Sequence, residues 1–376
     1  MSRPLARLMR KSRRLYTMAA LCHRTNPLWR FTYPTTLGRA RRLCKKEGFE
    51  PAEAFRLGLF HPALSKEEVA KYVSRKRLTK AQKTLNPVGW APLLKNKDIF
   101  YHFCAALDIP IPQLYAVIQP PSPGWSHVGR LPRTPIEWTT FFDKDLPPEF
   151  AIKPATGAYG HGFNIFRKAS GRYTDVTGVH VKDTDLYETI VSPNRNRYII
   201  QERLHSHVAL ARLSDTKALQ TVRFITLIDR SGCVQILHAH LKVIENDEIV
   251  DTFIDGLKGN IEAPVDLQSG SLRPANRIPG TGSGVITLKV HPKTGIAFDG
   301  FELPFWPDAC RLVTQTAPHF LPLRTIGWDV ALTPAGAVMV EGNVWWDPHN
   351  QHGNMNVVLG RLSESGPPSP EEHYRP

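Results

Sequence analysis

The chain has 376 residues, of which 41% are hydrophobic and 22% are charged, and its net charge is +14. It has no apolar run of the roughly 18 residues needed to span a bilayer, so the composition predicts a soluble globular protein of two or three compact units. The five cysteines are odd in number and scattered, which argues against a zinc site and for a reducing, cytoplasmic compartment.

The excess positive charge lies at the N-terminal end. Residues 1–85 hold 21 Lys or Arg and 5 Asp or Glu, a balance of +16, whereas the remaining 291 residues hold 27 and 29, a balance of −2. Within residues 1–31, Leu or Met at positions 5, 8, 15 and 18 suits one face of a basic helix. This helix could pack on the body, contact a membrane surface peripherally or an acidic protein, or bind RNA. Nucleic acid is the least favoured partner, because no aromatic stripe or RNA-binding signature accompanies the charge.

The segment from Thr36 to Thr84 is also predicted to be helical. A short helix covers Pro51–Phe60, and Ser65 and Glu68 form a capping box that opens a helix continuing through Val73. Asn86-Pro87 then marks a boundary, so residues 1–85 form a basic helical N-terminal region.

The next segment mixes helices and strands. A helix is predicted over Leu94–Leu107, a strand over Leu114–Ile118, a loop over residues 119–133, and a further helix that starts at Thr134. A strand over Tyr198–Leu204 follows.

Residues 147–166 carry the first informative motif and are called the flap. Two β-like runs flank a loop with three glycines, and Lys153 ends the first run. Glycines let backbone N–H groups approach anionic oxygens, and the lysine adds a compact positive charge suited to a phosphate. Because an aromatic and β-branched run follows the loop, where a Walker or dinucleotide motif would open a helix, we interpret it as a β-hairpin over a nucleotide. Taken alone, such a stretch is more often a Gly-rich hairpin of a β-rich domain.

The second half of the chain is richer in strands. An antiparallel hairpin is predicted from strands Thr221–Ile228 and Cys233–Ile244, followed by a strand Val285–Val290 and a helix at about residues 308–320. A tight turn at residues 334–336 joins two last strands, and residues 361–376 are predicted to be a disordered tail.

The last hairpin, Gly327–Asn343, carries the second informative motif. It brings Asp329 close to Glu341 and Asn343, which lie two apart and therefore on one strand face. Two carboxylates and an amide oxygen match Mg²⁺. A solvated charge cluster is the alternative, which the apolar neighbours weaken because unpaired carboxylates in a core are costly.

Other polar residues have two interpretations each. Arg223 and Lys242, on neighbouring strands, could neutralise phosphate or be charges at a sheet edge, and Lys97 is a weaker candidate of the same kind. Histidines at 205, 207 and 161, and at 238 and 240, could bind metal. We favour structural or substrate contacts for them, because no Cys or carboxylate stands at ligand spacing. Residues 345–349, Trp-Trp-Asp-Pro-His, could line a substrate pocket or simply pack.

The ordered set of motifs resembles the ATP-grasp superfamily, and most closely its sugar-transfer-associated family, which is related to glutamate-ligase-type enzymes. The resemblance covers about residues 40–350. The matching segments are Asn96–Asp98, Ile152–Pro154 with the flap, Ile200–Leu204, Thr221–Arg223, Val250–Asp251 with the loop after it, His291–Gly295, Leu303–Trp306, Gly327–Val330 and Glu341–Asn343.

The resemblance implies an α+β ATP-grasp fold, in which two subdomains clasp ATP, and it implies roles for single residues. Mg²⁺ would be held by Asp329, Glu341 and Asn343, and the reacting phosphoryl group would be neutralised by Arg223 and Lys242. The nucleotide-binding set would be Lys97, Lys153, Thr156, Gly157, Gly160, Gly162, Gln201, Glu202 and Leu204, with the last three forming the adenine hinge. The subdomains would span residues 86–210 and 211–360.

The resemblance also implies a reaction. Relatives phosphorylate a carboxylate to an acyl phosphate, which an amine or other nucleophile attacks, and the family's sugar link implies a small-molecule or glycoconjugate substrate in polysaccharide biosynthesis. An ATP-grasp kinase acting on a hydroxyl, or an inactive ATP-grasp body that carries a basic binding module, are the alternatives. Two departures from the family pattern are Ala158-Tyr159 in the flap and an N-terminal region without the usual βαβ unit, so the acceptor site cannot be placed by analogy.

Overall fold

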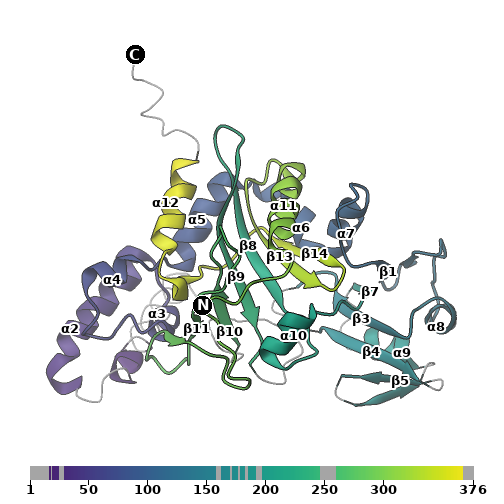
Figure 1. The fold of residues 1–376 in the computed structure, drawn as a ribbon, viewed down its shortest axis with the longest axis horizontal. Helices are drawn as coiled ribbons and strands as arrows, with labels where there is room; N and C mark the ends of the chain where they lie inside the picture. The colour runs from purple at the N-terminus through teal and green to yellow at the C-terminus, as the bar shows by residue number, and fades with distance from the viewer. Residues whose placement is uncertain are drawn as a thin grey trace, which may run out of the picture.

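The computed structural model describes residue 17 and residues 19–24, 29–157, 162–169, 172–176, 178–182, 185–191, 197–245 and 260–366 (Figure 1). Several predictions fall outside these ranges: most of the helix in residues 1–31, Gly160 and His161 of the flap, the loop at Val250–Asp251, and residues 367–376.

The first sheet, here called the N-terminal sheet, contains seven antiparallel strands among the described residues, in the order β2-β1-β7-β3-β4-β5-β6. Its strands are β1 (Leu114–Ile118), β2 (Trp125–Ser126), β3 (Glu149–Pro154), β4 (Asn164–Ala169), β5 (Arg172–Asp175), β6 (His180–Lys182) and β7 (Tyr198–Glu202). The predicted strand Leu114–Ile118 is confirmed, and the flap is a hairpin of β3 and β4, as predicted. Strand β7 ends at Glu202, two residues earlier than predicted.

Helices α8 (Pro135–Lys144) and α9 (Leu186–Val191) cover one face of the N-terminal sheet. Thr134 and Glu137 form the capping box that starts α8. Trp138, Phe141 and Phe142 of α8 join Phe150 of β3 in an aromatic core. Burial of such large side chains fixes the position of strand β3, and therefore of Lys153 at its end.

The second sheet, the C-terminal sheet, also has seven antiparallel strands among the described residues, in the order β12-β11-β10-β9-β8-β13-β14. Its strands are β8 (Thr221–Ile228), β9 (Val234–Val243), β10 (Ile261–Pro264), β11 (Ala275–Arg277), β12 (Ile286–Leu288), β13 (Thr325–Thr333) and β14 (Gly336–Asn343). Both predicted hairpins, β8–β9 and β13–β14, are confirmed. The predicted strand Val285–Val290 is shorter, and Val290 instead forms an isolated bridge with Ala297.

One face of the C-terminal sheet is covered by helix α11 (Trp306–Thr316) and the short helix η5 (Ala317–Phe320), close to the predicted helix at 308–320. Phe224 of β8 stacks on Trp306 of α11 with ring centroids 5.1 Å apart. Because neighbours along a strand point to opposite faces, Arg223 faces away from α11, toward the N-terminal sheet.

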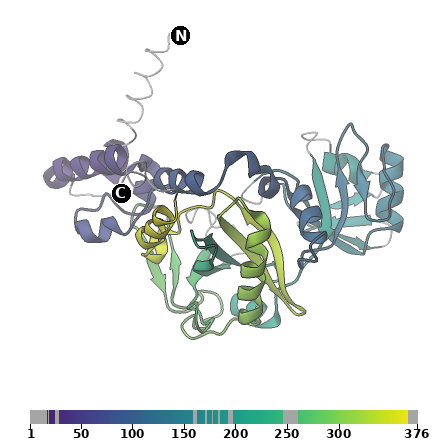
Figure 2. The same ribbon diagram turned by 90° about the horizontal axis from the view of Figure 1, so that it is seen from above.

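The N-terminal helices lie beside the C-terminal sheet, on the side away from the N-terminal sheet (Figures 1 and 2). They are α2 (Trp29–Arg42), the π-helix η1 (Leu43–Glu47), α3 (Pro51–Arg56), α4 (Lys66–Ala70) and α5 (Arg75–Leu85). Phe49, Phe55 and Phe60 form a small core with Ile278 of the C-terminal half, so this region is anchored on the body. The Ser65–Glu68 capping box is present, but helix α4 ends at Ala70 instead of reaching Val73.

Two predictions near the domain boundaries need correction. The predicted helix Leu94–Leu107 is two helices, α6 (Pro92–Lys95) and α7 (Lys97–Ala105), because Asn96 is extended with φ −99° and ψ 107°. Both pack on the C-terminal sheet, whereas the sequence predicts a first subdomain over residues 86–210. Helix α12 (Met355–Glu364) buries Leu362 against α5, so residues 361–366 are not a disordered tail.

The five cysteines, Cys22, Cys44, Cys104, Cys233 and Cys310, are all free thiols. Within the described part of the chain, every helix is too short or too polar to cross a bilayer.

Candidate active site

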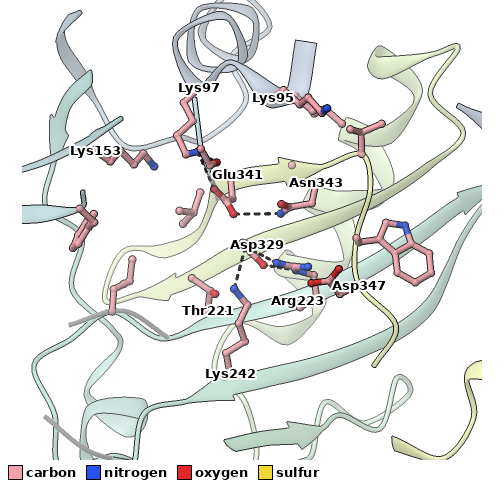
Figure 3. A pocket seen from close by; sticks show the side chains of 18 of the residues that line it. Lys95, Lys97, Lys153, Thr221, Arg223, Lys242, Asp329, Glu341, Asn343 and Asp347 are labelled. Atoms are coloured by element: carbon pink, nitrogen blue, oxygen red, sulfur yellow. Dashed lines mark hydrogen bonds and ion pairs between the residues drawn. The ribbon is translucent and has the colours of Figure 1, made fainter. Parts of the chain in front are cut away.

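A cleft lies between the two sheets, and α6 and the start of α7 form part of its wall (Figure 3). Its volume of about 830 Å³ is in the usual range for a ligand site. Its walls include twelve of the fourteen residues predicted to form the site: Lys97, Lys153, Thr156, Gly157, Gln201, Glu202, Leu204, Arg223, Lys242, Asp329, Glu341 and Asn343. Gly162 lies in the flap outside the cleft lining, and Gly160 is outside the described residues.

Two lysines from different elements point into this cleft. Lys97, the first residue of α7, places Nζ 3.1 Å from the Gly157 carbonyl and 3.8 Å from Glu341 Oε2. Lys153 is 8% exposed, and its Nζ donates to the Tyr101 hydroxyl at 3.1 Å. Burial, together with the nearby charge of Lys97, lowers the pKa of Lys153 to about 7. An anion bound in the cleft would therefore favour the protonated form of Lys153.

The flap loop depends on glycine conformations. Gly157 has φ +140° and Gly162 has φ +73°, values that side-chain-bearing residues rarely adopt. A Cβ on Gly162 would also lie 2.9 Å from Pro154 Cγ. Thr156 is exposed beside Gly157 at the cleft wall, so backbone groups of this loop are accessible from the cleft.

The end of strand β7 forms the wall predicted to be an adenine hinge. Glu202 pairs with Gln113 in both directions: its amide donates to the Gln113 carbonyl at 2.8 Å, and its Oε2 accepts from the Gln113 amide at 3.1 Å. Buried Gln201 accepts a hydrogen bond from the Tyr101 hydroxyl at 2.9 Å. Leu204 follows the strand and lines the cleft.

Tyr101, on α7, was not predicted from the sequence. The Tyr101 hydroxyl oxygen accepts a hydrogen bond from Lys153 Nζ. The same oxygen lies 2.9 Å from Gln201 Oε1 and 3.0 Å from the Val340 carbonyl oxygen. It therefore joins both sheets. A 3.6-residue period from Lys97 would have placed it one turn along the same helix face.

Asp329 is a buried carboxylate that two cationic side chains of the cleft contact. It is 3% exposed, and Arg223 donates to both of its oxygens, from Nε at 2.5 Å and from a terminal nitrogen at 2.9 Å. Lys242 Nζ lies 3.0 Å from Oδ2. Burial alone would raise the pKa of Asp329, but Arg223 and Lys242 outweigh it and hold that pKa well below its usual range. Asp329 also holds the pKa of Arg223 above its ordinary value, against the effect of burial.

Glu341 and Asn343 form the more accessible part of the predicted magnesium set. Asn343 Nδ2 donates to Glu341 Oε1 at 3.3 Å, and register pairs Glu341 with Asp329 across β13 and β14. The three side chains lie on the same side of the strands, with the Asn343 amide nitrogen turned toward Glu341 (Figure 3). This donor set fits a hard dication such as Mg²⁺, which needs few protein ligands. An ion here would share Asp329 with Arg223 and Lys242.

The cleft floor is a row of directly opposed residues across the C-terminal sheet. His240 pairs with Arg223, Arg223 with Asp329, and Asp329 with Glu341. Opposed residues share a sheet face. The row accordingly runs from two bases on β9 and β8 to two carboxylates on β13 and β14.

Two further predictions concern the cleft edge. The segment at residues 345–349 does line the cleft, and Asp347 forms an ion pair with Arg75 of α5 at 2.7 Å. Among the described residues, His205 and His207 belong to no group of metal-type ligands: His205 lies 3.5 Å from Glu149, and His207 caps α10 (Val208–Ser214) by accepting from the Ala209 amide.

Comparison with known proteins identifies relatives of this chain. The model of the family described as sugar-transfer associated ATP-grasp matches residues 76–365, well over half of the chain. This match confirms the resemblance seen in the sequence and the α+β ATP-grasp fold. No curated protein matches the chain.

Solved structures with some likeness include three ATP-grasp-type proteins. N5-carboxyaminoimidazole synthase from Aspergillus clavatus, solved with ADP and 5-aminoimidazole ribonucleotide, has 9% identity and a TM-score of 0.39, covering 75% of this chain and 54% of its own. D-alanine–D-alanine ligase from Helicobacter pylori has 10% identity and a TM-score of 0.41, with coverages of 73% and 62%. A RimK domain protein from Sphaerobacter thermophilus has 13% identity and a TM-score of 0.35, with coverages of 74% and 69%. The chain spans less than two thirds of the length of the first two.

Proposed function

Because this chain belongs to the sugar-transfer associated ATP-grasp family, we propose that it is a Mg²⁺- and ATP-dependent, ADP-forming ligase. It would phosphorylate a substrate carboxylate to an acyl phosphate and direct an amine or other nucleophile to it. The superfamily includes ATP-dependent ligases, and the family's sugar-transfer association favours a glycoconjugate or polysaccharide pathway.

The observation that carries this proposal is the meeting of the flap side and the carboxylate strands in one cleft. Lys97 Nζ lies 3.8 Å from Glu341 Oε2, and Lys153 from the flap strand faces the same space (Figure 3). Positive groups on one wall and hard oxygen donors on the other suit a metal-bound triphosphate between them.

Each residue then has a proposed role. Lys97 and Lys153 would bind phosphate oxygens, and the flap loop with Thr156, Gly157, Gly160 and Gly162 would cover them with backbone N–H groups. The adenine would lie at Gln201, Glu202 and Leu204. Glu341, Asn343 and Asp329 would hold Mg²⁺, which when bound offsets phosphate charge and favours attack at phosphorus.

Arg223 and Lys242 would neutralise charge that develops on the transferred phosphoryl group. Their cationic groups are already held by Asp329, so they need little reorganisation during the reaction. Tyr101 would keep Lys153 aligned through its hydroxyl. Attack of the carboxylate oxygen on the γ-phosphorus breaks the bond to ADP, and the nucleophile then displaces phosphate from the acyl carbon.

Domain limits, partners and cellular location remain proposals. We propose the subdomain division of the sequence prediction, with residues 86–107 moved to the C-terminal body on which α6 and α7 pack. A cytoplasmic location, and a peripheral membrane or acidic-protein contact through residues 1–31, are proposed on the sequence pattern alone.

The test is a screen of carboxylate and amine pairs for ADP release. Wild type should release ADP only when both substrates are present, and Glu341→Gln should bind the metal poorly and lose turnover. ADP release with a hydroxyl acceptor and no amine would favour the kinase alternative. ATP binding without turnover, with partner binding retained by residues 1–85, would favour an inactive body.

A further inference from the structure

A second group of metal-type ligands lies at the far end of the cleft floor. It consists of His238 and His240 on β9, Glu262 on β10, and His349 and His352 at the short helix η6 (Asn350–His352). Ligand atoms of His240, Glu262 and His349 lie within 4.8 Å of one another, and all three residues are buried. They come from three separate segments, so their convergence is a property of the fold.

The contacts of Glu262 leave its carboxylate among imidazoles. Its Oε1 lies 3.4 Å from His240 Nε2, and its Oε2 lies 3.5 Å from His349 Nδ1 and 3.2 Å from His352 Nε2. Gln351 Nε2 donates to the same Oε2. A buried carboxylate is costly unless hydrogen bonds or a cation accompany it.

Two buried ring nitrogens in the group make no hydrogen bond of normal geometry among the described residues, although the first of them lies 3.4 Å from Glu262 Oε1. They are His240 Nε2 and His349 Nε2. The other nitrogen of His240, Nδ1, lies 3.1 Å from His238 Nε2, so His240 can donate from Nδ1 and keep a lone pair on Nε2. A partner on the second nitrogen is the usual support of a metal-binding histidine.

We propose that His240, Glu262 and His349 bind a first-row transition-metal dication of the zinc type. Two imidazoles and one carboxylate suit Zn²⁺ and its neighbours, whereas Mg²⁺ prefers oxygen ligands only. His238 orients His240, and Gln351 and His352 orient Glu262. The ion is distinct from the Mg²⁺ proposed above, because β9 is two strands from β13, roughly 10 Å at the usual strand spacing.

The position of this site links it to the cleft. Glu262, His349 and Gln351 line the cleft wall, whereas His238 lies behind them. Lys242 and Arg223 stand between the histidine group and Asp329 on the same sheet face. A bound ion would therefore keep one side open toward the cleft, as metal sites that accept a further ligand do.

The experiment uses the full chain, freed of metal with a chelator and then titrated with Zn²⁺ or Co²⁺. Wild type should bind one ion per chain at this site, Co²⁺ should give visible ligand-field bands, and X-ray absorption of the Zn²⁺ form should place nitrogen and oxygen ligands at about 2.0–2.1 Å. His349→Ala should weaken Zn²⁺ binding by more than about 100-fold, and Gln351→Ala by about 10–100-fold.

Three further variants make the result specific. Glu262→Gln should lose the ion, whereas His319→Ala, at an exposed histidine elsewhere, and Glu341→Gln should keep it. Circular dichroism and urea unfolding of the metal-free variants separate lost binding from lost folding, and His349→Ala, at the cleft wall, provides a second test if Glu262→Gln does not fold. Absence of stoichiometric Zn²⁺ or Co²⁺ binding in wild type, or binding abolished by Glu341→Gln and kept by Glu262→Gln, would overturn the proposal.

Discussion

Replacing Lys153 with methionine should make the unliganded protein more stable at neutral pH. The Lys153 side chain is 8% exposed, and burial followed by repulsion from Lys97 lowers its pKa from 10.5 to about 7. That pKa change corresponds to a cost of about 5 kcal/mol for keeping Lys153 charged in the folded protein, since one pKa unit is about 1.4 kcal/mol. Methionine fills similar space without a charge to bury.

The sign of the pH dependence follows from the two pKa values. The folded pKa lies below the unfolded one, so between pH 7 and 10.5 the unfolded chain binds the extra proton. The lysine therefore destabilises the fold fully below pH 7, and this cost disappears as the pH rises toward 10.5. Lys153→Met should raise the free energy of unfolding by about 2–4 kcal/mol at pH 7, with a smaller gain at pH 10.

Urea unfolding of wild type and Lys153→Met at both pH values measures this difference. Lys144→Met, at an exposed position on α8, is the matched control and should change stability little at either pH. A Lys153→Met protein that is less stable than wild type at pH 7, or a gain that does not shrink at pH 10, would refute the reasoning.

The same group predicts a proton linked to nucleotide binding. A triphosphate beside Lys153 would favour its charged form, so binding of Mg-ATP should take up about one proton at pH 8.5 and about a quarter of a proton at pH 6.5. Calorimetry in two buffers of different ionisation enthalpy measures the uptake. Lys153→Met should bind more weakly and take up none; equal uptake by the variant would show that another group titrates.

Three other substitutions test separate parts of the structure. Glu341→Gln should lower turnover by roughly 10²–10³-fold with unchanged circular dichroism, measured by ADP release, and wild-type turnover would remove the metal assignment. Asp329→Asn leaves Arg223 and Lys242 without their carboxylate and should cost about 3–5 kcal/mol in urea unfolding at pH 7. Because its pKa is depressed, the stability from Asp329 is present above its unfolded pKa and fades as the pH falls, so the two proteins should converge in acid. Gly342→Ala would place a Cβ 2.6 Å from Leu94 and should cost about 1–3 kcal/mol, whereas Gly360→Ala on α12, with open space, should not destabilise.

The sequence was informative where local chemistry decides the structure. Alternating strands with tight turns predicted both hairpins of the C-terminal sheet, and the capping boxes at Ser65 and Thr134 predicted two helix starts. Twelve of the fourteen residues that the sequence predicts for the site line one cleft. On the C-terminal sheet this follows because opposed strands carry their polar residues to the same face.

Contacts between segments that are far apart in the chain could not be predicted from the sequence. The sequence shows no carboxylate at ligand spacing from His238 and His240, but Glu262 lies beside them from β10, and His349 lies more than a hundred residues farther along the chain. Nothing in local spacing predicts such pairing, since strand order in the sheet is set by the whole core. The break at Asn96 was missed for a similar reason: the apolar period continues across it, and the Lys97 amide instead bonds to the Ala155 carbonyl.

The hydroxyl of Tyr101 has a single hydrogen, but two acceptor oxygens lie within hydrogen-bonding distance of it. With Lys153 donating to it, that hydrogen can satisfy either Gln201 on one half of the molecule or the Val340 carbonyl on the other, both within 3.0 Å. A small rotation of one half against the other could break one of these bonds while the tyrosine keeps its alternative partner. The Tyr101 hydroxyl can therefore keep one hydrogen bond when the two halves move apart. We expect the loss of the other bond to add little to the free energy of that movement.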